Sequence, residues 1–208
     1  MGRCKEDLMT INIDKKIVGW KIDSKSPTFK ENNAVKRPKE LPCNIHQVKI
    51  KGESWAIIVG MLEGKPYEIF GGLSKFIEIP KKYKDGVLIK GGKVNGLSKY
   101  NLVVGKDDDQ FTIKDVVSVF ENTTQGSFTR IISLSLRHGV AVNFVVEQLL
   151  KDQHSDVTSF SRVIARVLKT YIPEGTKSGI VCENCKSTNV VFEGGCLTCL
   201  DGCGSKCG

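Results

Sequence analysis

Hydrophobic and polar residues alternate between residues 45 and 114, and this pattern predicts β-strands. Three β-rich runs, at residues 46–51, 54–62 and 66–70, are separated by short turns that contain glycine. Such spacing is typical of an antiparallel meander. Both alternating sets of the middle run are apolar, so we expect that strand to be central and covered on both faces. Three further strands are predicted at 86–90, 99–104 and 111–114.

The apolar period changes near residue 120 to that of α-helices. We expect one helix to end at Gly139, and a third to begin with Ser155 or Asp156 as its N-cap and to end before Pro173. The three apolar stripes are Phe128, Ile131, Ile132, Ser135 and Leu136; Val142, Val145, Val146, Leu149 and Leu150; and Phe160, Val163, Ile164, Val167, Leu168 and Tyr171. The predicted fold is therefore α+β, an antiparallel sheet covered by about three helices.

The composition divides the chain of 208 residues into three segments. Residues 1–36 are polar and lysine-rich, as in a mobile arm or connector. Residues 37–174 carry the predicted α+β domain. Residues 180–208 are rich in cysteine and form a small zinc-ribbon-like module, and we expect the glycine-containing segment 173–179 between the two to be a flexible hinge.

Six cysteines lie in the last 27 residues of the chain. Cys182 and Cys185 form one C-x2-C pair, and Cys196 and Cys199 form another. Each such pair bends the backbone so that two thiolates converge, and two pairs complete a tetrahedral zinc site. Because the module has few apolar residues, we expect it to need the metal in order to fold. We therefore predict that these four cysteines bind zinc.

This assignment leaves Cys203 and Cys207 as a dithiol close to the C-terminus. Lys206 favours the thiolate, which is the attacking species in thiol–disulfide exchange. A second assignment stays open, because Cys199 and Cys203 could supply the second zinc pair, and Cys196 and Cys207 would then be left over. Under either assignment the tail holds four metal ligands and a spare dithiol.

The net charge and the hydropathy of the chain restrict the classes of protein to which it can belong. The formal charge of +8 favours an anionic partner, but the lysines are scattered and no RNP-type aromatic motif or helix-turn-helix signature accompanies them. No apolar run reaches the length of a membrane span, and the first residues do not resemble a secretory signal, so we expect a cytoplasmic protein. Cys4 and Cys43 are expected to be free thiols, and Glu68 and Glu147 receive no role in a site.

Four sequence blocks, in this order, resemble a known family. They are RPKELPCNIHQVKIKGESWAIIVGMLEGKPYEIFGG, FTRIISLSLRHGVAVNFVVEQLLKD, SFSRVIARVLKTYI and GGCLTCLDGCGSKCG. Together they are similar to the C-terminal region of adenosylcobalamin-dependent (class II) ribonucleotide reductases, the TSCPD-type domain with its cysteine-rich tail. The resemblance covers residues 37–208.

The resemblance implies a function. In the family, this region follows a catalytic barrel that contacts adenosylcobalamin, and we expect that barrel to belong to a partner chain. A C-terminal dithiol, matched here by Cys203 and Cys207, re-reduces the active-site disulfide of the barrel and is reset by thioredoxin or glutaredoxin. The chain would then be a C-terminal part or split subunit of a ribonucleoside-diphosphate or ribonucleoside-triphosphate reductase.

Two other functions stay open at this point. The +8 charge and the zinc ribbon also fit an adaptor that binds nucleic acid or protein. A regulatory or assembly subunit of the reductase without a redox role would fit the resemblance equally well.

Overall fold

The computed structural model describes residues 34–120, 122–151, 156, 158–203 and 206–207. Nearly all of the predicted N-terminal arm lies outside these ranges, as does Ser155, one of the two predicted N-caps. Residues 33–208 form one compact unit, to which all the described elements belong. Among the described residues, no helix is both long enough and apolar enough to cross a membrane.

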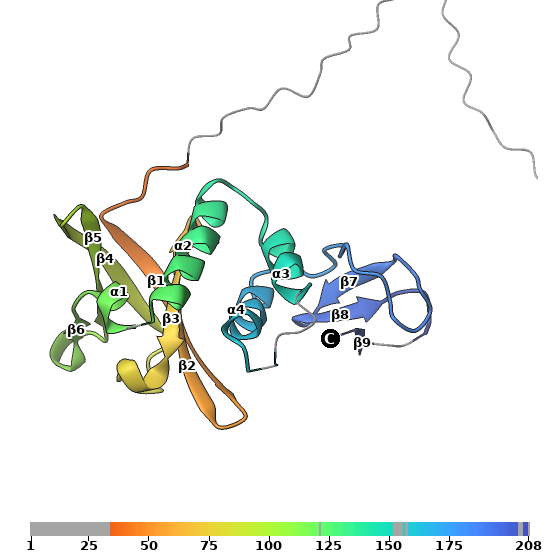
Figure 1. Cartoon of the computed structure of the whole chain (residues 1–208), viewed down its shortest axis with the longest axis horizontal. Coiled ribbons are helices and arrows are strands. Elements are labelled where there is room, and N and C mark those ends of the chain that lie inside the picture. The colour runs from red at the N-terminus through yellow and green to blue at the C-terminus, as the bar shows by residue number, and fades with distance from the viewer. Residues whose placement is uncertain (1–33, 121, 152–155, 157, 204–205, 208) are drawn as a thin grey trace, which may run out of the picture. The chain divides into compact units, whose positions relative to one another are not determined.

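Six antiparallel strands form the main sheet, in the order β3-β2-β1-β4-β5-β6 (Figure 1). Strand β2 pairs with β1 on one side and β3 on the other, and it is buried on both faces, as its apolar pattern predicted. The bounds are β1 (Glu40–Ile50), β2 (Glu53–Leu62), β3 (Lys65–Leu73), β4 (Asp85–Val94), β5 (Leu97–Val104) and β6 (Phe111–Ile113), with short 3-10 turns at Ser74–Phe76 and Asp107–Asp109.

The sheet is strongly curled. Strands β3 and β5 are separated in the strand order by β2, β1 and β4, yet the rings of Phe70 and Tyr100 lie 5.2 Å apart. The inner face of the curl holds its own apolar core, which includes Leu41, Ile58 and Leu88. At Gly60 a Cβ atom would lie 2.7 Å from Leu41 Cδ2, so this close approach of side chains requires glycine.

Four α-helices follow the sheet in sequence: α1 (Val116–Val119), α2 (Thr123–Arg137), α3 (Val142–Leu150) and α4 (Phe160–Lys169). The three longer helices confirm the predicted α+β fold, whereas the single turn of α1 was not predicted. The cap of α4 is Ser159, whose hydroxyl accepts a hydrogen bond from the backbone N–H of Arg162. The predicted N-cap at Asp156 is therefore wrong.

The buried face of α2 also differs from the predicted one. Ile131 belongs to the predicted apolar stripe, but 64% of its surface is exposed. Thr129 and Ser133 are buried instead, because α2 lies along the edge strand β3 and uses polar groups there. The backbone N–H of Ile69 donates a hydrogen bond to Ser133 Oγ at 3.0 Å. Hydrogen bonding to a strand edge therefore decides which face of α2 is buried.

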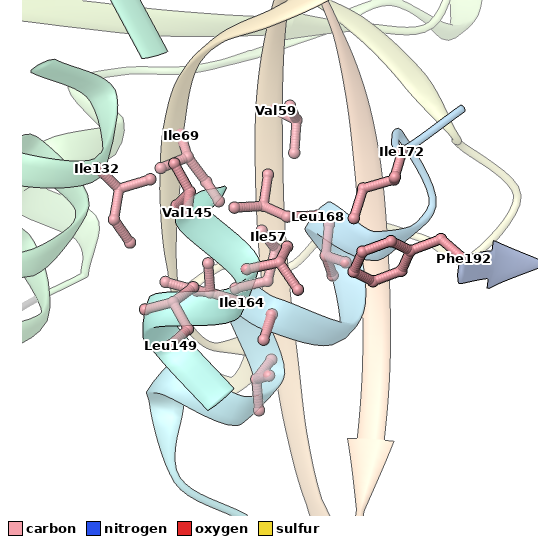
Figure 2. Packing of buried hydrophobic residues seen from close by; sticks show 14 of the residues in the cluster. Ile57, Val59, Ile69, Ile132, Val145, Leu149, Ile164, Leu168, Ile172 and Phe192 are labelled. Atoms are coloured by element: carbon pink, nitrogen blue, oxygen red, sulfur yellow. The ribbon is translucent and has the colours of Figure 1, made fainter. Parts of the chain in front are cut away.

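A second apolar core lies on the outer face of the sheet. Helices α3 and α4 lie between this sheet and a small second sheet formed by β7 (Val190–Glu193), β8 (Cys196–Cys199) and β9 (Lys206–Cys207) (Figure 1). Figure 2 shows Phe192 of β7 beside Leu168 and Ile172. The cysteine-rich tail and the α+β domain therefore share one core.

The segment between the α+β domain and the tail is not the flexible hinge that its glycines suggested. The backbone N–H of Phe192 donates to Thr176 O, and the N–H groups of Gly175 and Ser178 donate to carbonyls of β7. The buried carboxylate of Glu147 on α3 accepts a hydrogen bond from the N–H of Gly179 at 3.0 Å. These bonds attach the beginning of the tail to the domain.

Replacing Ile164 with Ala should lower the free energy of unfolding by about 2–5 kcal/mol, because Ile164 is fully buried in the outer core and a cavity would remain. Urea denaturation of both proteins measures the difference. The control is Ile131→Ala, which removes the same kind of side chain from the exposed surface of α2. It should change the free energy of unfolding by no more than about 0.5 kcal/mol. Equal losses in the two variants would contradict the assigned core.

Candidate metal centre

Four cysteine sulfur atoms converge in the tail. The Sγ atoms of Cys182, Cys185, Cys199 and Cys203 all lie within 4.8 Å of one another. Cys182 and Cys199 are buried, and Cys185 is exposed, so the cluster lies at the edge of the tail. Such a set of thiols is the ligand set of structural zinc sites.

The first pair of sulfurs is presented by a tight turn. The backbone N–H of Lys186 donates to Cys182 O at 2.9 Å, which closes a turn that contains Cys185. Lys186 has a φ of +59°, a left-handed conformation that turns the chain back after Cys185. The N–H of Cys182 in turn donates to Ser187 O. This C-x2-C pair therefore forms the bend that its spacing predicted.

The second pair is Cys199 and Cys203, not Cys196 and Cys199. Residues 196–199 form strand β8, in which successive side chains point to opposite faces. Two residues three positions apart therefore cannot present both sulfurs to one metal. The turn begins only after Cys199 and contains Gly202, whose φ of +77° suits glycine. The geometry therefore favours the second assignment that the sequence left open.

Asp201 links the two turns. One oxygen of its carboxylate accepts a hydrogen bond from Ser187 Oγ, and the other accepts one from Asn189 Nδ2 at 2.8 Å. Ser187 follows the first cysteine pair, and Asp201 lies between the two cysteines of the second. These bonds hold the pairs in register, so the position of the four sulfurs depends on polar contacts as well as on the strands.

The spacing of the sulfurs fits zinc. Zn–S bonds of about 2.3 Å in a tetrahedron place the sulfurs about 3.8 Å apart. Cys182 Sγ lies 3.6 Å from Cys203 Sγ, and Cys185 Sγ lies 3.5 Å from Cys199 Sγ. A hydrogen bond from the backbone of Asp201 lowers the pKa of the Cys199 thiol, but burial and the other three thiols outweigh it and raise that pKa to about 12. A bound cation would supply the charge that keeps these sulfurs ionised.

Among the cysteines whose side chains the structure describes, Cys43 and Cys196 lie outside this cluster. Cys196 is exposed, and the backbone of Cys207 pairs with that of Leu197, the residue next to Cys196. Cys43 lies in the inner core of the sheet, where burial raises the pKa of its thiol to about 12 and keeps it neutral. Cys4 lies outside the described residues.

Comparison with protein families matches residues 41–173 to the NrdJ homologue C-terminal domain. The chain belongs to this family. The match covers the curled sheet and the four α-helices, and it relates the chain to the class II ribonucleotide reductase NrdJ. Neither the search of curated proteins nor the search of solved structures found a match.

The NrdJ-related domain also contains a buried ion cluster that the sequence did not reveal. Glu68 on β3 is fully buried and accepts hydrogen bonds from two arginines. Arg37 donates from Nη2 to Glu68 Oε1 at 2.7 Å, and Arg137 of α2 donates from Nη2 to Oε2 at 2.6 Å. Each guanidinium also lies over a ring, that of Arg37 over Tyr100 and that of Arg137 over Tyr67.

The three charged residues stand far apart in the sequence, so no local spacing could have predicted them. Arg37 precedes β1, Glu68 lies in β3 and Arg137 ends α2. Arg37 further donates to Leu88 O on β4 at 3.1 Å, so one side chain joins β3 to β4 across the curl. We assign this cluster a structural role, that of holding the curled sheet and α2 together.

Proposed function

We propose that the chain supports ribonucleotide reduction together with a reductase catalytic domain that contacts adenosylcobalamin. Membership of the NrdJ homologue C-terminal family carries this proposal. In it, the tail binds one zinc ion through Cys182, Cys185, Cys199 and Cys203, and the zinc has a structural role. The remaining tail thiols, Cys196 and Cys207, carry reducing equivalents to the active-site disulfide.

The position of Cys196 supports this division of roles. Cys196 is exposed, so a disulfide of another domain could reach it. Lys169 on α4 is close enough to Cys196 for their charges to interact, although burial is the main influence on that lysine and lowers its pKa. The thiolate is the form that attacks a disulfide.

Cys207 is held to the rest of the tail by a very short strand, which suits a thiol that must move during the reaction. Strand β9 contains only Lys206 and Cys207, and it pairs with β8 through Thr198 and Leu197. Short terminal strands of this kind open at little free-energy cost. When Cys196 and Cys207 join in a disulfide, they release the two electrons and two protons that re-reduction of the active-site disulfide consumes. Thioredoxin or glutaredoxin in a reducing cytoplasm would then restore the dithiol.

Turnover with two reductants tests this function. We expect the double variant Cys196→Ser, Cys207→Ser, mixed with the catalytic domain, to fold and keep its metal but to lose turnover when thioredoxin is the reductant. Turnover with dithiothreitol should persist, because a small dithiol can reach the active-site disulfide directly. Cys4→Ser, which removes a thiol outside the tail, is the control and should turn over normally with both reductants.

Normal turnover of the double variant with thioredoxin would exclude these two thiols as the shuttle. A shuttle formed by Cys203 and Cys207, the pair that the sequence first indicated, would give a different result for the variant Cys203→Ser. If Cys203 belongs to the shuttle, Cys203→Ser should abolish turnover with thioredoxin and leave the metal content unchanged. If Cys203 is a ligand, as we propose, the same change should lower the metal content.

A further inference from the structure

A pocket of about 440 Å³ opens between α2, α1, β3 and β5. It lies beside the contact of Phe70 with Tyr100, where the two sides of the curled sheet approach each other. Its volume is within the range of about 300–1,000 Å³ that is usual for small-molecule sites. None of the residues that line it belongs to the cysteine-rich tail, so the proposed redox function leaves this pocket unexplained.

One wall of the pocket is a face of α2. Gly126, Thr129, Ser133 and Arg137 recur every three or four positions and therefore lie on the same side of the helix. A helix that only packs against a sheet presents large apolar side chains on such a face. On α2, Thr129 and Ser133 are buried along β3, and Gly126 leaves space beside them, since a Cβ atom there would have no neighbour within 4 Å.

The walls of the pocket are predominantly cationic. Lys99, Arg130 and Arg137 line it, and Asp115 is the one carboxylate among the lining residues. Lys99 forms an ion pair with Asp115, and Arg137 forms one with Glu68. Arg130 has no ion pair within the described part of the chain. Its charge is available to an anionic ligand.

Apolar and aromatic side chains complete the walls. Phe70, Tyr100 and Phe120 line the pocket and can contact the face of a flat ring. Leu97 and Leu134 also line it, and their exposed fractions are 57% and 56%. A ligand with a ring would cover apolar surface of this kind.

We infer that the pocket binds a small organic anion that has a flat ring. Arg130 and Arg137 hold the anionic group, and the aromatic side chains of the wall contact the ring. The inference rests on the α+β domain alone and goes beyond the proposed redox role, so either can fail without the other.

Titration calorimetry of the full chain with nucleoside monophosphates tests the inference, because these probes combine a flat ring and an anionic group. At least one of the monophosphates of adenosine, guanosine, cytidine and uridine should bind at millimolar concentration or below. The matching nucleoside, which lacks the anion, and inorganic phosphate, which lacks the ring, should each bind about tenfold more weakly or worse.

Three variants locate the binding. Arg130→Gln should weaken it by about ten- to a hundredfold, since a charge-assisted hydrogen bond is lost. Gly126→Phe fills the open space on α2 and should abolish binding while the protein remains folded. Arg166→Gln on α4 removes an exposed arginine that does not line the pocket, and it should bind like the unaltered chain.

Several results would overturn the inference. Failure of all four monophosphates to bind at millimolar concentration would mean that the pocket takes no ligand of this kind. Undiminished binding by Arg130→Gln and Gly126→Phe would place the ligand elsewhere on the chain. If inorganic phosphate binds as tightly as the monophosphate, the pocket does not recognise the ring. If a nucleoside binds as tightly, the pocket does not recognise the anionic group.

Discussion

A chain in which Cys199 is replaced by Ser is expected to lose its bound metal and the fold of its tail. Cys199 is buried and contributes one of the four converging sulfurs, so its loss leaves three ligands. Structural zinc sites contribute about 10–16 kcal/mol of apparent binding free energy, more than so small a tail could gain from apolar burial. Elemental analysis should find about one zinc per unaltered chain and close to none in the variant.

The matched control is Cys196→Ser, which removes a cysteine of the same strand. Cys196 is exposed and lies outside the cluster, so this variant should keep its metal. If Cys196→Ser loses as much metal as Cys199→Ser, the four ligands are those of the paired C-x2-C spacing, and the geometry of β8 must change when metal binds. An unaltered chain that contains no metal would refute the site.

Loss of the metal should also loosen the neighbouring domain. Phe192 and Leu197 of the tail belong to the same apolar core as Ile164 and Leu168 of α4. Hydrogen exchange of the metal-free protein should therefore become faster in β7 and in α4, while the inner strands β1 and β4 should remain protected. Unchanged exchange in α4 would show that the shared core does not depend on the metal.

Replacing Glu68 with Gln should lower the free energy of unfolding by about 3–5 kcal/mol. The carboxylate is fully buried, and the change leaves Arg37, whose side chain is 5% exposed, without its counter-charge. Arg137 loses the same partner. Chemical denaturation of the two proteins under identical conditions measures the loss.

Asp109→Asn provides the comparison for Glu68→Gln. Asp109 pairs with Lys82 at the surface, where both side chains are more than half exposed, and solvent screens such pairs. We expect that change to have little effect on stability. A Glu68 variant that is no less stable than the Asp109 variant would mean that the buried cluster does not hold the curled sheet together.

The α+β fold could be predicted from the sequence because it depends on local periodicity. The apolar pattern of β2 predicted a strand covered on both faces, and the regular stripe of α4 predicted a buried helix. Apolar patterns of this kind show which residues become buried when the chain folds. The face of α2 was predicted less well, because its burial depends on hydrogen bonds to the edge strand β3, and these bonds have no apolar signature.

The metal centre was only partly predictable. The spacing of Cys182 and Cys185 predicted one of the two pairs of sulfurs that converge, since a turn of two intervening residues brings two sulfurs together whatever surrounds it. The same spacing at Cys196 and Cys199 does not bring that pair into the cluster, because those residues form a strand that pairs with β7. Pairing between strands depends on the partner strand, which spacing within a single segment does not describe.

By itself, the sequence determined the six strands of the main sheet, the three longer helices and a cysteine-rich tail suited to zinc, since each depends on the order of residues within a short segment. Only the tertiary structure decided which cysteines converge, which arginines meet Glu68 and where the cationic pocket forms. Arg37, Glu68 and Arg137 are brought together by the curl of the sheet and the path of α2. Contacts between segments so far apart in the chain arise only when the whole domain is folded, because long-range packing decides them.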